Sequence, residues 1–187
     1  MRIISFFLIL GLLTQIAFAE VIENLDYQYY DVSIAANQSL PFALNQTSPI
    51  KQDGKAHHGY TKWDVRWNYR SSSDNNGMCR IISSTTTIQG SILLPRLVSA
   101  TEAQRSQFDC YVTALQEHEQ GHYQIGKNAA KAIDEQILSL PVASDCRTLE
   151  KAVNDGAYQT LEEYKKMERE YDAKTMHGKK QGAWLAN

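Results

Sequence analysis

The stretch that decides the fold class is Thr61-Lys62-Trp63-Asp64-Val65-Arg66-Trp67-Asn68-Tyr69. Its odd-numbered positions are mainly aromatic or aliphatic, and its even-numbered positions are all polar. Successive side chains of a strand point to opposite faces of a sheet, so this alternation predicts a strand with one buried face. A loop rich in Ser and Asn follows over residues 71–77. Cys79–Leu94, rich in Ile, Thr and Ser, predicts the next strand, and we expect Pro95 to end it.

Around these strands the pattern changes from strands to helices along the chain. Tyr27–Ser33 predicts a first strand, and Ser39–Ser48 predicts one or two helical turns. Thr101 is a candidate N-cap for a long helix, and a second helix is expected over about Thr148–Thr175, with Gly178 as its stop. Strands followed by helices are typical of an α+β domain. We therefore expect a small antiparallel sheet packed on the long helix and a C-terminal helix.

Both predicted helices carry an apolar stripe. In the first, the inward positions recur at spacings of mostly three and four, which is the pattern of one helix face. Gly126 lies off this stripe and is expected to loosen the helix there. The inward positions are Phe108, Tyr111, Leu115, His118, His122, Ile125, Ala129, Ala132 and Ile133 in the first helix, and Val153, Leu161, Tyr164, Met167 and Tyr171 in the second.

The composition excludes several classes of protein. The chain has 187 residues, 43% of them hydrophobic, and a formal net charge of −2 from 19 basic and 21 acidic residues. Such a chain can bury a core, which excludes a disordered or low-complexity protein. A nucleic-acid partner is not expected, because that function requires a concentrated surplus of Lys and Arg.

The first residues have the pattern of a secretory signal peptide. One positive charge at Arg2 precedes a short apolar run, and the small residues Ala17 and Ala19 favour cleavage after Ala19. We therefore expect a signal peptide over residues 1–19 and a single secreted or periplasmic domain over residues 20–187. No other segment is long and apolar enough to cross a membrane, so no anchor is expected after cleavage.

Three cysteines would then lie in an oxidising compartment. They allow one disulfide, and spacing alone does not choose the pair. We favour Cys79–Cys146, because Cys110 falls in the middle of a predicted helix.

The segment His118-Glu119-Gln120-Gly121-His122 carries the chemistry. Two histidines at i and i+4 lie one turn apart on one helix face, so both imidazoles can bind one ion. Both positions fall on the apolar stripe, where an unpaired polar ring is unfavourable. Glu119 projects at a neighbouring angle and can accept a proton from a water at the metal.

A catalytic zinc site needs a third protein ligand and an open position. His177 is our first choice, because it stands at the end of the second helix just before Gly178. Asp172 is the main alternative, either as a ligand or as an acceptor that orients one imidazole, and Glu162 and Glu163 follow. Tyr171 either stabilises the oxyanion of a tetrahedral intermediate or is a core aromatic.

The sequence resembles the bacterial domain-of-unknown-function family nine-twenty-two, commonly described as secreted zinc-dependent proteases. Four motifs across the expected mature chain carry the resemblance: Thr61-x-Trp63, Leu94-Pro95, the His118–His122 segment, and Tyr171-Asp172-x-x-Thr175-x-His177-Gly178. The resemblance implies a compact, zincin-like α+β fold with Zn²⁺ at the HExxH helix. It also implies a functional role for the segment from Tyr171 to Gly178, but it supplies no substrate.

These observations lead to one main hypothesis and one alternative. The main hypothesis is a secreted zinc metalloprotease that cleaves peptide or other amide bonds, with Glu119 and Tyr171 as catalytic residues and His118, His122 and His177 as metal ligands. The alternative is a non-catalytic secreted binding domain in which the metal stabilises a small fold. A glycosidase is a poorer candidate, because no carboxylate pair stands out in an apolar setting.

Overall fold

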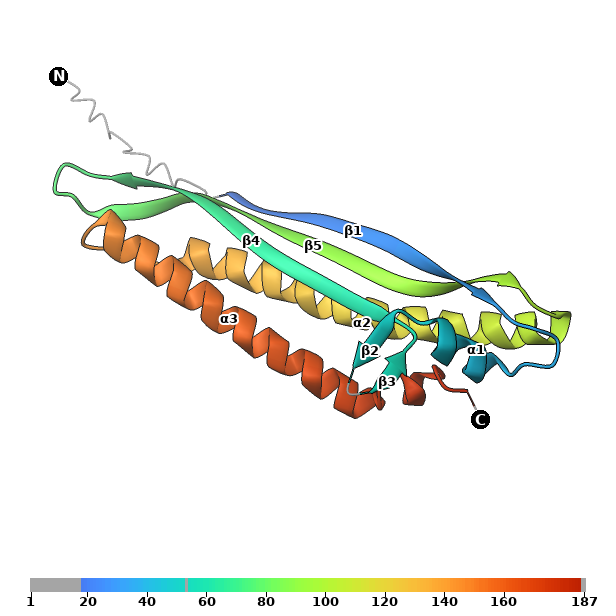
Figure 1. Ribbon diagram of the computed structural model, residues 1–187. Coiled ribbons are helices and arrows are strands. Elements are labelled where there is room, and N and C mark those ends of the chain that lie inside the picture. Colours follow the sequence, from blue (N-terminus) through green and yellow to red (C-terminus); the bar gives the residue numbers. More distant parts are fainter. Residues whose placement is uncertain (1–17, 53, 186–187) are drawn as a thin grey trace, which may run out of the picture.

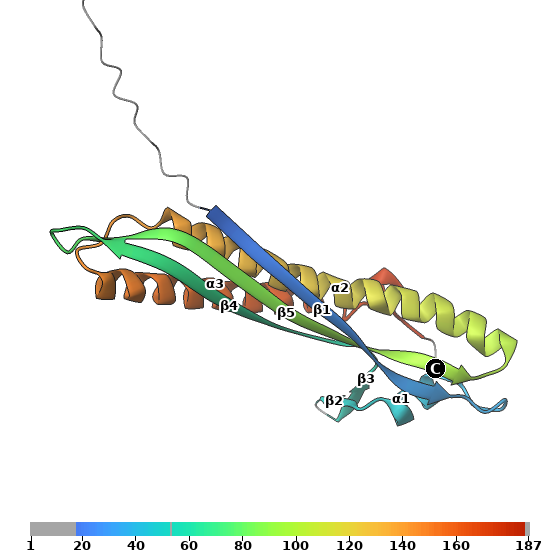
Figure 2. The same cartoon turned by 90° about the horizontal axis from the view of Figure 1, so that it is seen from above.

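A three-stranded sheet forms one layer of the molecule, and two long helices form the other (Figures 1 and 2). The computed structural model describes residues 18–52 and 54–185. The sheet consists of β1 (Phe18–Ser33), β5 (Cys79–Ser99) and β4 (Tyr60–Ser73), in that spatial order. The α+β class is therefore confirmed. The expected all-antiparallel sheet was wrong: β4 pairs antiparallel with β5, whereas β1 pairs parallel with it.

The strands are longer than the sequence pattern indicates. The predicted strand at Tyr27–Ser33 is the second half of β1, which pairs with β5 along its whole length. Pro95 does not end β5. It pairs with Tyr30 of β1, and the last β4 partner of β5 is Leu93. Pro95 thus lies where β5 has a neighbour on one side only, the position at which a strand tolerates a residue without an N–H group.

Two helices cover the inner face of the sheet. Helix α2 (Glu102–Ser139) begins at Thr101, whose side chain and that of Gln104 form a capping box, as the N-cap prediction requires. Helix α3 (Cys146–Thr175) begins at the N-cap Asp145 and packs beside α2 (Figure 1).

Short elements gather at the C-terminal end of α3 (Figure 1). Helix α1 (Leu40–Thr47) lies within the stretch Ser39–Ser48, where helical turns were predicted, and has Ser39 as its N-cap. A hairpin of β2 (Ile50–Gln52) and β3 (Lys55–His57) follows it. After α3 the chain forms a single turn, η1 (Lys179–Gln181).

The core lies between the sheet and α2, with contributions from α1 and α3. Its fully buried members include Val32, Leu44, Ile88, Ile92, Leu94, Ile133, Ile137 and Val153.

Two expectations about the helices were wrong. Gly126 does not loosen α2; it is buried, and a Cβ atom there would lie 2.6 Å from the ring of Trp63, so the missing side chain makes room for the indole. Met167 does not face inward, since 49% of its surface is exposed.

The disulfide joins Cys79 of β5 to Cys146 at the start of α3, as predicted, and Cys110 is free and exposed. A structural disulfide fits residence in an oxidising compartment. Most of the predicted signal peptide lies outside the described residues. Within the described part of the chain, no helix combines the length and apolarity that crossing a membrane requires.

Candidate metal centre

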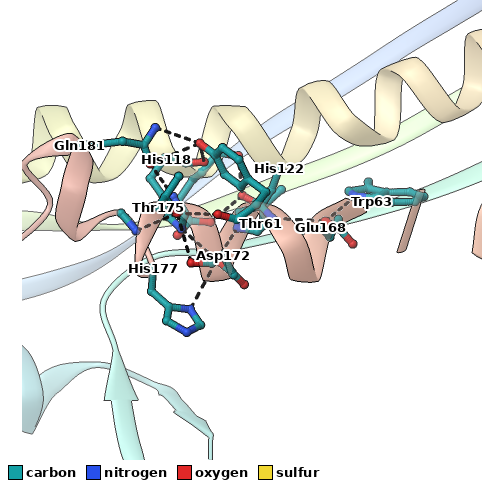
Figure 3. Close-up of polar contacts among 12 residues, drawn as sticks. Thr61, Trp63, His118, His122, Glu168, Asp172, Thr175, His177 and Gln181 are labelled. Carbon is teal, nitrogen blue, oxygen red and sulfur yellow. Dashed lines mark hydrogen bonds and ion pairs between the residues drawn. The ribbon is translucent and has the colours of Figure 1, made fainter. Parts of the chain in front are cut away.

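His118 and His122 point from α2 towards Asp172 on α3 (Figure 3). The Nε2 atoms of the two imidazoles lie 3.3 Å and 3.1 Å from the same oxygen, Oδ1 of Asp172. One ligand atom from each of these three residues lies within 4.8 Å of the other two. The structure therefore brings the predicted ligands His118 and His122 together with Asp172, which the sequence analysis considered as the main alternative to His177.

The spacing of these atoms fits a small divalent ion. Around a tetrahedral Zn²⁺ with bonds of about 2.0–2.1 Å, neighbouring ligand atoms lie roughly 3.3 Å apart. The two Nε2–Oδ1 distances, 3.3 Å and 3.1 Å, are close to that value. Two imidazole nitrogens and a carboxylate oxygen are also a donor set that zinc accepts.

The other nitrogen of each imidazole has its own oxygen partner. Nδ1 of His118 donates to Oε1 of Gln181 at 2.9 Å, and Nδ1 of His122 lies 3.4 Å from Oε1 of Glu168. The indole of Trp63 in turn donates to the same Glu168 oxygen at 2.8 Å. A proton on Nδ1 leaves the lone pair on Nε2, so these partners favour the tautomer in which both Nε2 atoms can bind a metal.

Charge at this centre is concentrated on Asp172. Burial raises the pKa of Asp172, but hydrogen bonds from His118 and His122 outweigh it and hold that pKa well below its usual range. Burial by itself lowers the pKa of His122, but hydrogen bonds to Asp172 and Glu168 outweigh this effect and raise the pKa to about 9.

Glu119 lies in the wall of the centre without being a member of the ligand group. Only 5% of its surface is exposed, and its Oε2 lies 2.7 Å from the hydroxyl of Thr61 at the start of β4. A Cβ atom at Gly59 would lie 2.5 Å from Oε1, so only glycine leaves room for this carboxylate. Burial raises the pKa of Glu119 despite the opposing hydrogen bond from Thr61.

Tyr171 forms part of the contact between α2 and α3. Its ring stacks on His118 with a centroid separation of 5.2 Å, and its hydroxyl lies 3.3 Å from the backbone oxygen of His118. Gln181 donates to the same hydroxyl at 3.0 Å. A Cβ atom at Gly121 would lie 2.1 Å from this hydroxyl, so the glycine of the HEQGH segment permits the contact. The catalytic role of Tyr171 stays a prediction.

His177 lies beside the ligand group. Its side chain is 66% exposed, and its Nδ1 atom is 3.4 Å from Oδ1 of Asp172. Its backbone φ of 51° places it in the left-handed region after the end of α3. Its prediction as a ligand stays open. The other carboxylate candidates, Glu162 and Glu163, are exposed and are not among the residues brought together at the centre.

A cleft of about 640 Å³ opens at this centre. Its walls come from β2, β3 and the start of β4 on one side and from α2 and α3 on the other. The residues that line it include His57, Gly59, Thr61, Tyr111, His118, Glu119, His122, Glu168, Asp172 and His177.

A family model described as "Bacterial protein of unknown function (DUF922)" matches residues 27–178. The chain belongs to the DUF922 family. The match covers β2, β3, β4, α2 and α3, the strands and helices that line the cleft, but not η1, which supplies Gln181. No curated protein and no solved structure matches the chain, so the zincin-like aspect of the fold prediction is not supported by any solved relative.

Three residues that support the centre of this DUF922 chain were not assigned that role from the sequence: Thr61, Glu168 and Gln181. For Glu168 a signal exists, because it lies one turn before Asp172 on the same helix. Thr61 stands in a motif that carried the family resemblance, but the motif does not reveal its contact with Glu119. Gln181 follows the helix end, and only the turn of the backbone after Met176 brings it to His118.

Proposed function

We propose that this protein is a zinc-dependent hydrolase of peptide or other amide bonds, in which His118, His122 and Asp172 bind the metal. The observation that carries the proposal is the orientation of the two imidazoles. Both Nε2 atoms converge on one point beside Asp172, while both Nδ1 atoms are bound by oxygen atoms outside it. Pairing of this kind is typical of histidines that bind metals.

Glu119 supports a catalytic site in preference to a purely structural one. When bound, a zinc ion supplies a Lewis acid that polarises the scissile carbonyl and lowers the pKa of water. Glu119 accepts the proton of the attacking water and returns it to the leaving nitrogen. Its raised pKa suits a group that must both accept and release a proton, and the Thr61 hydroxyl fixes the orientation of its carboxylate.

A second function, a binding module with a structural metal, is favoured by the position of His177. Its Nδ1 atom lies 3.4 Å from Oδ1 of Asp172, the oxygen that both Nε2 atoms face, so His177 is a candidate fourth ligand. Four protein ligands would close the coordination sphere and leave no position for water. The two functions therefore differ in whether hydrolysis depends on Glu119.

The test compares Glu119→Gln with Glu117→Gln. Glu117 lies on the same helix, is exposed and does not line the cleft, so it is a matched control. We expect stoichiometric zinc by elemental analysis in both variants and in the original chain. Cleavage of an unfolded protein such as casein should fall at least about 100-fold in Glu119→Gln only. Zinc binding without any hydrolysis that depends on Glu119 would favour the binding module.

A further inference from the structure

The charged groups that line the cleft differ in the partners they have within the protein. Each of the acidic groups Glu119, Glu168 and Asp172 has a partner: the Thr61 hydroxyl, the Trp63 indole and the imidazoles, respectively. All three carboxylates are therefore already engaged by hydrogen-bond donors or imidazoles of the protein.

The basic side chains of the cleft come from both of its walls. Arg169 and Lys165 line the cleft from α3, and Lys55 lines it from β3 on the facing wall. Lys165 is paired with Glu162 at 2.9 Å. Arg169 and Lys55 are exposed, and neither forms an ion pair with any residue in the described ranges 18–52 and 54–185. A bound divalent cation would add further positive charge to this cleft.

The helix sets the distances from the metal centre. Arg169 and Lys165 precede Asp172 by three and seven residues, so they lie about 4.5 Å and about 10.5 Å away along the axis of α3. An extended peptide advances about 3.3 Å per residue. A chain that runs along α3 in the cleft therefore passes Arg169 within about one to two residues, and Lys165 within about three residues, of the bond held at the centre.

We propose that the cleft selects substrates that carry a carboxylate within about three residues of the scissile bond, with Arg169 and Lys55 as the residues that recognise it. The proposal rests on the proposed function, because it places the carboxylate relative to a bond that is cleaved. Selective binding of the carboxylate requires only the cleft. The carboxylate belongs either to an Asp or Glu side chain or to the C-terminus of a peptide. Both present the same chemistry to a guanidinium group.

The experiment measures binding to the zinc-loaded Glu119→Gln chain, so that turnover does not interfere. The probes are three dye-labelled alanine-rich peptides: one with a central glutamate and blocked ends, its glutamine counterpart, and the glutamine peptide with a free C-terminal carboxylate. Fluorescence anisotropy gives each Kd. Arg169→Gln/Lys55→Gln is compared with Lys166→Gln/Lys174→Gln, which removes the same charge from exposed α3 positions outside the cleft.

We expect at least one carboxylate peptide to bind about tenfold more tightly than the blocked glutamine peptide. The preference should fall below about twofold in the cleft variant, persist in the control variant and weaken at high salt. Whichever carboxylate peptide binds more tightly identifies the source of the group. Equal binding of all three peptides, or a preference that survives in the cleft variant, overturns the proposal.

The outcome is separable from that of the proposed function. Selective binding without hydrolysis by the original chain would retain the carboxylate site and reject the hydrolase. Hydrolysis of casein without any enrichment of Asp, Glu or C-terminal residues near the cleaved bonds would retain the hydrolase and reject the carboxylate site.

Discussion

Helix α3 is attached to the rest of the molecule by different means at its two ends. At one end α3 begins at Cys146, bonded to Cys79, and Leu149 and Val153 are buried within it. At the other end Asp172 and Tyr171 contact the two histidines of α2. The first end is stabilised by a covalent bond and by apolar packing, whereas the second depends on polar groups arranged around a position that suits a cation. The groups that stabilise the fold and the groups of the candidate metal centre therefore lie at opposite ends of α3.

Removing the disulfide should give the largest effect. It joins residues separated by 67 positions, and opening a loop of that length costs about 4 kcal/mol of unfolding free energy. We expect Cys79→Ala/Cys146→Ala to lose about this amount in urea unfolding, with zinc affinity unchanged in the folded protein. Cys110→Ala is the control, because this thiol is exposed and unbonded. A matching loss of zinc affinity would show that the two ends are not independent.

Replacing Asp172 and His177 in separate variants should show which of them is the third metal ligand. Asp172→Asn removes the carboxylate that both Nε2 atoms face, so zinc affinity should fall about 100-fold or more in a chelator competition. His177→Asn, at an exposed position beside the group, should cost less than about tenfold. The reverse order would make His177 the third ligand.

Much of the fold and of the candidate metal centre could be predicted from the spacing of residues in the sequence. The i, i+4 histidines predict their own convergence, because helix geometry fixes their separation. Alternation predicted β4, and the N-cap and apolar stripe predicted α2. The parallel pairing of β1 was not predictable, since it depends on which edge of β5 is free after the hairpin with β4 forms. Which of Asp172 and His177 lies within the group formed with the two histidines depends on the last turn of α3 and the left-handed residues after it, which the sequence pattern does not specify.

Replacing Glu168, whose carboxylate lies beside Nδ1 of His122, should have a smaller effect. Glu168→Gln keeps an oxygen near Nδ1 but removes its charge, so zinc affinity should fall about tenfold. Glu170→Gln provides the control on the same helix, because Glu170 is exposed and pairs with Lys166. Isothermal titration of zinc into both variants measures the difference. Equal affinities would mean that Glu168 does not support the imidazole.

The smallest expected effect is on the pH dependence of stability, and it arises from His58 on the opposite wall of the cleft. Burial, with the nearby charges of His57 and Lys51, lowers the pKa of His58 to about 4. Neutral His58 accepts a hydrogen bond from Tyr111 and donates one to Asn45. Its contribution to stability is therefore present above pH 6.5 and is lost as the pH falls through about 4.

We expect this loss to be about 1 kcal/mol after allowance for partial exposure. Urea unfolding of the chelated protein at pH 7.5 and 4.5, compared with His58→Asn, measures it. The variant should show a shallower pH dependence between these values. An unchanged dependence would assign the acid sensitivity to other groups.

The contact of Gln181 with His118 has a consequence for how the protein is made. These residues lie 63 positions apart, and Asp172 lies 50 positions after His122. During synthesis or export from the N-terminus, the histidines emerge well before the groups that orient and complete them. A nascent chain thus carries the HExxH segment without its supporting partners, and the candidate metal centre would be complete only after α3 and the following turn have docked.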